Sequence, residues 1–162
     1  MLNPKILACL TALSLVAACS GNTDSNAAAT GAGAGAGTTG TGPRAGSQED
    51  LVANVGDRVF FDTDRSNIRA DQATVLSRQA TWMGTHPQVQ VTVEGHADER
   101  GTREYNLALG QRRANAARDG LVAGGVSGAR IQTISFGKDR PASLGSTADA
   151  WQQNRRAVTV AR

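Results

Sequence analysis

Cysteine is almost absent from this 162-residue sequence, and its two copies, Cys9 and Cys19, both lie near the N-terminus. A fold stabilised by disulfides needs cysteines spread through the chain, so the folded part is expected to depend on its apolar core. The rest of the chain also offers no free thiol, which argues against a catalytic cysteine and against a zinc site built on cysteine.

Lysine is equally scarce. Lys5 and Lys138 are the only two, and arginine supplies the other basic side chains. The formal net charge is only +3, with acidic and basic residues interleaved. Because nucleic-acid-binding domains more often carry a clustered basic stripe, we do not expect nucleic acid as a partner.

The N-terminus lacks an apolar run long enough to cross a bilayer as a helix; residues 6–16 have the length of the apolar region of a signal peptide. The run ends in Val16-Ala17-Ala18-Cys19, which resembles a bacterial lipobox. The resemblance implies a signal peptide over residues 1–18, cleavage between Ala18 and Cys19, and a lipid on Cys19. Ser20, in place of aspartate, implies the outer membrane, with the folded domain facing the periplasm. The alternative is ordinary secretory cleavage beside an incidental cysteine.

Residues 19–50 contain no aromatic and no large apolar residue, and they include the stretch GAGAGAGTTGTG. Such a segment cannot bury enough surface to offset the entropy lost on ordering, so it is predicted to be a flexible linker. A random coil of this length has a root-mean-square reach of roughly 30 Å. The folded domain is then expected to cover residues 51–162.

Hydrophobic periodicity within residues 51–162 predicts an α+β domain. The expected helices cover residues 70–83, with Asp71 as a candidate cap, and residues 102–123. Four segments are expected to be strands, at residues 59–61, 88–94, 131–136 and 155–160. This order of elements favours a small mixed four-stranded sheet with helices packed on one face.

A charged loop, EGHADERGTREYN, covers residues 94–106 between a predicted strand and a predicted helix, which is a favoured position for a ligand. Helical spacing places Asn106, Leu109, Gly110 and Arg113 on one face, and Gly110 there leaves room for a close approach. Asp98 and Arg113 would then lie near each other. On spacing alone, they form either a structural salt bridge or part of a binding site.

Metal binding is not supported by the pattern, and no cofactor is expected. Glu94, His96 and Asp98 share one face of an extended chain, but no His-x-x-x-His pair or cysteine completes a site. Residues 62–66 begin like a calcium loop, but the sixth position is Asn67 and the twelfth is Ala73, where glycine and glutamate are required.

Catalysis is also disfavoured. The sequence has no Gly-x-Ser-x-Gly motif for a serine nucleophile. Glu94 and Asp98 could form the carboxylate pair of a glycan hydrolase. Arg100 and Arg103 nearby would keep both carboxylates ionised, which is unsuitable for a general acid. We expect a protein that is not an enzyme, with a peptidoglycan hydrolase as the alternative from a different class.

The stretch EGHADERGTREYNLALGQRRA is very similar to the core motif of the OmpA C-terminal-like domain family, and especially to that of its peptidoglycan-associated lipoproteins. Three further segments match the same pattern in the same order: Phe60-Phe61-Asp62, Phe136-Gly137-Lys138 with Pro141, and Asn154-Arg155-Arg156-Ala157-Val158. The likeness covers about residues 57–162. It implies an OmpA C-terminal-like domain after a disordered lipoprotein tether.

The resemblance implies non-covalent binding of peptidoglycan through meso-diaminopimelate, whose side chain ends in an ammonium and a carboxylate. Asp98 would receive the ammonium, and Arg113 would bind the carboxylate bidentately. Asp98→Ala or Arg113→Ala is then expected to leave the domain folded and to remove wall binding. The family pattern adds further contacts at Phe61, Asp62, Arg100, Gly101, Thr102, Tyr105, Asn106 and Leu109.

The remaining residues of the loop receive other interpretations. Glu94 and His96 are expected to support it, and Arg103 departs from the proline often found there in the family, which leaves open the charge of the pocket and the stiffness of the loop. The family also implies membership of the Tol–Pal system, with TolB docking over the same surface, and a role in envelope integrity and cell division. A wall-binding lipoprotein without Tol partners is the alternative.

Overall fold

The computed structural model describes residues 42–162. The predicted signal peptide, the lipidation site Cys19 and linker residues 19–41 lie outside the described residues. The described part contains four α-helices, one short 3-10 helix η1 (Gly128–Arg130) and four strands.

The four strands form one mixed sheet in the order β1-β4-β2-β3. They are β1 (Arg58–Phe60), β2 (Val91–His96), β3 (Ile131–Gly137) and β4 (Arg156–Ala161). Strand β2 pairs in parallel with β3 and antiparallel with β4, and β4 pairs antiparallel with β1. The predicted small mixed sheet is confirmed.

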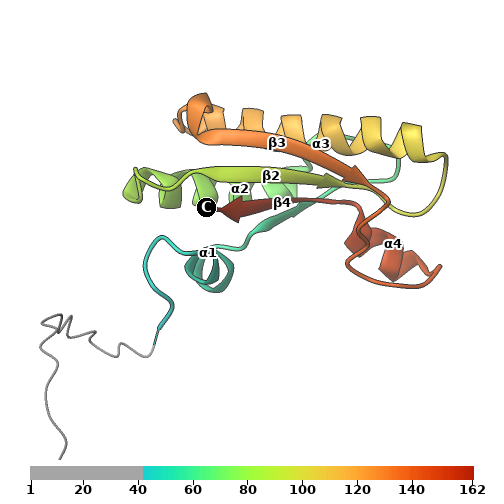
Figure 1. The fold of residues 1–162 in the computed structure, drawn as a ribbon, viewed down its shortest axis with the longest axis horizontal. Helices are drawn as coiled ribbons and strands as arrows, with labels where there is room; N and C mark the ends of the chain where they lie inside the picture. Colours follow the sequence, from blue (N-terminus) through green and yellow to red (C-terminus); the bar gives the residue numbers. More distant parts are fainter. Residues whose placement is uncertain (1–41) are drawn as a thin grey trace, which may run out of the picture. The chain divides into compact units, whose positions relative to one another are not determined.

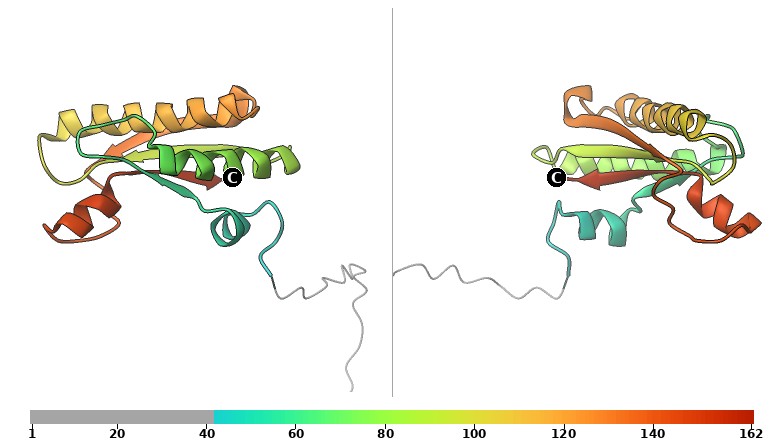
Figure 2. Two further views of the ribbon diagram at one scale, coloured as in Figure 1. Left: turned by 180° about the vertical axis from the view of Figure 1, so that it is seen from behind. Right: turned by 45° about the vertical axis from the view of Figure 1, so that its right-hand side comes forward.

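Two long helices, α2 (Ala70–Thr85) and α3 (Arg103–Ala123), lie side by side on one face of this sheet. Figure 2 shows both helices in front of the strands when the molecule is seen from behind. The short helices α1 (Gln48–Asn54) and α4 (Ala148–Asn154) lie at the margins of the sheet (Figure 1). Both short helices were missing from the sequence-based expectation.

The core lies between the sheet and the two long helices. Its buried apolar side chains come from every layer and include Leu76, Met83, Val91, Val93, Ala117 and Leu121. Strand β2 and helix α3 approach closely, because a Cβ on Gly95 would collide with the carbonyl oxygen of Gly110. The room predicted at Gly110 is therefore occupied by the Ser135 hydroxyl of β3 and the Gly95 backbone of β2, not by a ligand.

Helix α1 corrects the predicted linker of residues 19–50, which extends too far. Ser47 caps the helix by accepting a hydrogen bond of 3.2 Å from the backbone N–H of Asp50. The buried Asp50 carboxylate accepts bonds of 2.9 Å from both the Trp82 indole and the Gly46 backbone N–H. Gln48 accepts a bond of 2.7 Å from the backbone N–H of Ala161, at the end of β4. Residues 46–50 thus belong to the folded domain.

Two other boundaries differ from the prediction. The strand expected over residues 88–94 begins at Val91, because Val89 donates its backbone N–H to the carbonyl of His86 in a turn. Helix α2 has Arg69 at its N-cap position with no side-chain cap, so Asp71 does not cap it. Asp71 lies in the first turn and pairs with Arg69 at 3.0 Å.

Candidate functional site

The loop that joins β2 to α3 is held in place by its own backbone and by side chains. Gly101 has φ of +89°, a left-handed conformation that favours glycine. Thr102 caps α3 by accepting a bond of 3.2 Å from the backbone N–H of Tyr105. The buried Asn106 amide donates to the carbonyl of Arg100 at 2.7 Å, and Lys138 donates to the carbonyl of Gly101 at 2.7 Å. Asn106 therefore holds the backbone of the loop against the first turn of α3.

Asp98 lies at the start of this loop and is buried, with 7% of its surface exposed. Its carboxylate accepts a 2.6 Å hydrogen bond from Nη2 of Arg100 and a 3.4 Å bond from Nη1 of Arg155. Burial raises the pKa of Asp98, but the bonds from the two arginines and from the Arg100 backbone N–H outweigh it. The net pKa lies below its ordinary value, so Asp98 is an anion at neutral pH.

Arg113 is fully buried beneath the same loop. Its guanidinium donates to three backbone carbonyls, at 2.9 Å to Arg65, 2.8 Å to His96 and 3.0 Å to Asp62. Burial lowers the pKa of Arg113 to about 10, so it stays protonated at neutral pH. Arg113 thus ties the segment after β1 to the end of β2. Since a guanidinium has five N–H donors, two remain beyond these three bonds.

Within residues 42–162, Asp98 and Arg113 do not form an ion pair; Asp98 pairs with Arg100 and Arg155. Phe61 is buried beneath Arg113, whose guanidinium carbon lies 5.3 Å from the ring centroid. Leu109 is buried as well. Phe61 and Leu109 are therefore buried side chains that do not line the pocket beside the loop.

A pocket of about 230 Å³ is lined by Asp64, Arg100, Gly101 and Tyr105, and Asp98 adjoins it through its bond to Arg100. Three of these four residues were expected from the sequence. Asp64 was not, although its φ of +53° is unusual for a residue other than glycine. The predicted Asp62 contributes its carbonyl to Arg113, while its carboxylate lies 3.6 Å from Arg69.

Two residues of the site were not predicted from the sequence: Arg155, which bonds to Asp98, and Trp151, which contacts Arg100. Arg155, at the end of α4, reaches Asp98 and also donates to the carbonyl of Phe61 at 3.2 Å. The guanidinium carbon of Arg100 lies 4.4 Å from the ring centroid of Trp151. The Trp151 indole N–H donates to the Glu99 carboxylate at 3.0 Å. The segment Asn154-Arg155-Arg156 is part of the family resemblance, but a local pattern does not show that Arg155 binds Asp98, 57 positions away.

His96, Glu94 and Arg103 surround the site without lining the pocket. The buried His96 ring lies 3.6 Å from the Glu94 carboxylate, and neither of its nitrogens has a hydrogen-bond partner in the described part of the chain. Burial and the positive charge of Arg156 lower the pKa of His96 to about 4, so the ring is neutral at pH 7. Arg103 pairs with Asp139 at 2.7 Å and so binds the turn after β3.

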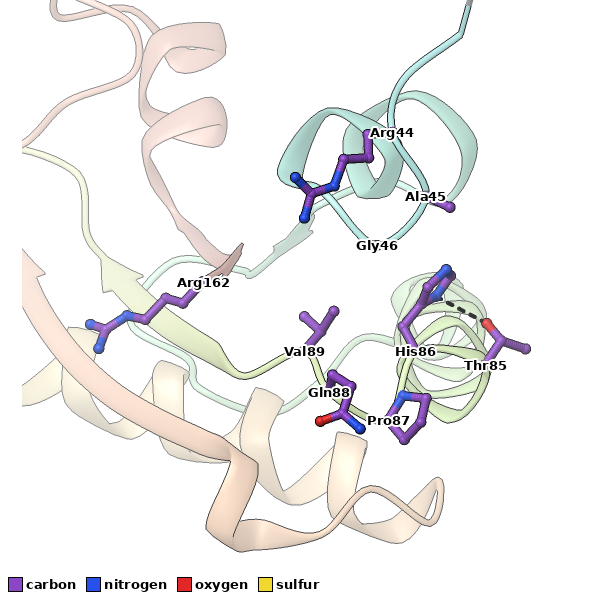
Figure 3. Close-up of a pocket in the computed structure, with 9 residues that line it drawn as sticks. All are labelled: Arg44, Ala45, Gly46, Thr85, His86, Pro87, Gln88, Val89 and Arg162. Carbon is purple, nitrogen blue, oxygen red and sulfur yellow. Dashed lines mark hydrogen bonds between the residues drawn. The ribbon is translucent and has the colours of Figure 1, made fainter. Parts of the chain in front are cut away.

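A larger pocket, of about 460 Å³, lies at the opposite end of β2 (Figure 3). It is lined by Arg44, Ala45, Gly46, Thr85, His86, Pro87, Gln88, Val89 and Arg162. Arg162 points away from the other labelled side chains and donates to Gln132 at 3.0 Å. A ligand site needs a few convergent polar groups, which this pocket lacks, so its size does not make it the candidate site.

Residues 42–162 contain no group of three or more His, Cys, Asp or Glu side chains that could hold a metal ion. No helix in this part of the chain has the length and apolar character needed to cross a membrane.

The sequence profile of the OmpA family matches residues 60–155. A peptidoglycan-associated lipoprotein from Mesorhizobium japonicum is 53% identical over 159 residues, covering 98% of this chain and 91% of the relative. The corresponding protein of Brucella melitensis is 59% identical over 115 residues, covering 71% of this chain and 68% of the relative.

Solved structures show the same fold. The crystal structure of the peptidoglycan-associated lipoprotein from Burkholderia pseudomallei is 38% identical, with a TM-score of 0.65, covering 70% of this chain and 100% of that one. The C-terminal domain of Helicobacter pylori MotB, 19% identical with a TM-score of 0.61, shares the fold alone and covers 65% of this chain and 84% of that one. The chain belongs to the OmpA family and, within it, to the peptidoglycan-associated lipoproteins.

Proposed function

We propose that this protein binds peptidoglycan non-covalently through the side chain of meso-diaminopimelate. One observation carries the proposal: the buried, ionised Asp98 lies among guanidinium groups beside a pocket. The names of the relatives, which are peptidoglycan-associated lipoproteins, support peptidoglycan as the ligand.

The ligand group is a zwitterion, with an ammonium and a carboxylate on one carbon. Asp98 receives the ammonium, because a carboxylate in a partly dry site binds a cation more strongly than an exposed one. Arg113 receives the carboxylate through its two remaining N–H groups. Gly101 and Tyr105 line the pocket, with Tyr105 43% exposed, and Thr102 and Asn106 hold the loop in shape.

The protein acts as a clamp and not as a hydrolase in this proposal. A glycan hydrolase needs one carboxylic acid that stays protonated near neutral pH. The pKa of Asp98 is shifted in the opposite direction, below its ordinary value, by its arginine partners. Incubation with purified peptidoglycan should therefore release no soluble muropeptides, and their release would show a hydrolase instead.

The N-terminal part of the chain would determine where in the cell this domain acts. A lipid on Cys19 holds the protein in the outer membrane, the linker supplies slack, and the domain binds the wall from the periplasm. As a Tol–Pal component it would also bind TolB over the same surface and serve envelope integrity and cell division. Purified TolB should then compete with peptidoglycan; wall binding unaffected by TolB would favour a wall-binding lipoprotein without Tol partners.

Peptidoglycan sedimentation tests the proposal. Asp98→Ala should lose roughly 2–5 kcal/mol of binding free energy, because the ammonium then meets no anion. Asp119→Ala, which removes an exposed carboxylate from the distal part of α3, is the matched control and should sediment like the unaltered protein. If the Asp98→Ala protein, shown to be folded by circular dichroism, sediments as strongly as the control, the proposed site is wrong.

A further inference from the structure

The proposed ammonium receptor is occupied in the free protein. Asp98 already accepts bonds of 2.6 and 3.2 Å from Nη2 and Nε of Arg100. Asp98 and Arg113 are both buried, at 7% and 0% exposure. A ligand therefore cannot reach either group unless a side chain over the site moves.

The two arginines that hold Asp98 differ in how firmly they are fixed. The Arg155 side chain is 11% exposed, and it is also bonded to the carbonyl of Phe61 and to the side chain of Gln152. The Arg100 side chain is 43% exposed. Apart from Asp98, the partners of its guanidinium within residues 42–162 are the Thr63 hydroxyl, at 3.4 Å, and the ring of Trp151. Arg100 is therefore the exchangeable partner, and Arg155 the permanent one.

We propose that Arg100 is a specificity-determining residue: the incoming ammonium displaces it from Asp98, and the released guanidinium then pairs, together with Arg113, with the carboxylate of the same zwitterion. This inference rests on the proposed function and refines it. Arg100 is the only cation among the four residues that line the pocket, so it lies where a ligand carboxylate would arrive. The neutral ring of Trp151 contacts the Arg100 guanidinium and does not depend on Asp98, so the Arg100 side chain stays near the pocket after release.

The exchange discriminates between two related ligands. Lysine is diaminopimelate without the second carboxylate, so it offers the ammonium alone. A lysine side chain would break the pair between Arg100 and Asp98 and give Arg100 no new partner. Diaminopimelate replaces the broken ion pair with two new ones, one at each end of the zwitterion. Arg100 thus weakens the binding of a ligand that offers only an ammonium, relative to a ligand that offers the complete zwitterion.

Calorimetry with two synthetic stem tripeptides tests this inference, one ending in meso-diaminopimelate and one in L-lysine. The unaltered protein should prefer the first. In Arg100→Ala, the lysine peptide should bind about fivefold more tightly, because it no longer breaks the partly buried ion pair between Arg100 and Asp98. Binding of the diaminopimelate peptide should change less, since Asp98 loses its pair with Arg100 and keeps only Arg155, while one contact to the ligand carboxylate is also lost.

Arg103→Ala is the matched control, because Arg103 lies on the same loop and pairs with Asp139 instead of Asp98. This variant should keep the preference of the unaltered protein. An unchanged preference in Arg100→Ala, or equal weakening of both peptides, would overturn the inference and leave the proposed function intact. If the unaltered protein binds neither peptide, the proposed function fails and this inference fails with it.

Discussion

At each end of β2 an arginine donates hydrogen bonds to backbone carbonyls, and the two ends differ in the groups around that arginine. At the end nearest the charged loop, Arg113 donates to the carbonyls of Arg65, His96 and Asp62. At the other end, Arg130 donates to the carbonyls of Met83, His86 and Val89. The same chemistry therefore holds the backbone at both ends of the strand.

The candidate site lies at only one of them. Near Arg113, the buried Asp98 and two further guanidinium groups meet beside a pocket of about 230 Å³. Near the start of β2 the pocket is larger, about 460 Å³, but its arginines do not converge. The difference teaches that binding of an arginine to backbone carbonyls does not by itself indicate a ligand site, because Arg113 and Arg130 both do so. The convergence of a fixed anion with cations indicates the binding site, and pocket volume does not.

The largest expected effect comes from removing Arg113. The sequence alone predicts that Arg113→Ala leaves the domain folded, but the contacts change that expectation. The substitution removes a buried bond to the His96 carbonyl and part-buried bonds to the carbonyls of Arg65 and Asp62, and it opens a cavity where a fully buried side chain stood. Either kind of loss costs on the order of 1–3 kcal/mol. We expect a loss of about 3 kcal/mol or more in unfolding free energy, measured by urea denaturation, together with lost wall binding. Unchanged stability would show that Arg113 serves the ligand alone.

Acidic pH should lower the free energy of unfolding through His96, which lies at the end of β2. The folded-state pKa of His96 is lowered to about 4 from its ordinary value of 6.5, so the unfolded chain binds the proton more readily. Stability is therefore fully present above pH 6.5 and declines as the pH falls toward 4. The full shift corresponds to about 3 kcal/mol. His96→Asn should lose this part of the pH dependence in urea titrations at pH 7 and pH 4.5, and a variant that retains it would assign the dependence to other groups.

Arg130→Ala should have a smaller effect than Arg113→Ala. Arg130 is only partly buried, so water can reach the carbonyls that it leaves. We expect a loss of about 1–2 kcal/mol in unfolding free energy. Peptidoglycan sedimentation should be unchanged, because the site lies at the other end of β2. A variant that folds but no longer sediments would break the comparison between the two ends.

Elements with a strong local signal were predictable from the sequence, and elements held by distant partners were not. Thr102 and the apolar spacing of α3 locate that helix within one residue of the prediction. Helix α1 has seven residues and depends on contacts from Asp50 to Trp82 and from Gln48 to Ala161, which no local window contains. Helix α4 is equally short.

The same limit applies to the site. Family resemblance identifies Asp98 and Arg113 as a pair, because their spacing is part of the motif. It does not reveal that Arg113 is bound to carbonyls or that Asp98 is bound by Arg100 and Arg155. Those partners come from the segment after β1, from the loop itself and from the end of α4. The charge state of the free site is therefore a property of the tertiary structure.

The smallest expected effect concerns Arg103, at a position where the family resemblance led us to expect proline. Arg103 is the first residue of α3, where proline is well tolerated because its fixed φ suits a helix start. Arg103→Pro would remove the exposed pair with Asp139 and stiffen the loop. We expect a slightly higher midpoint of thermal unfolding and unchanged affinity for the diaminopimelate peptide, since Arg103 lies outside the pocket. Asp139→Ala, which breaks the same pair without stiffening the backbone, is the matched control. A marked loss of affinity in Arg103→Pro alone would show that the loop must flex for Arg100 to leave Asp98, and would extend the site to the first turn of α3.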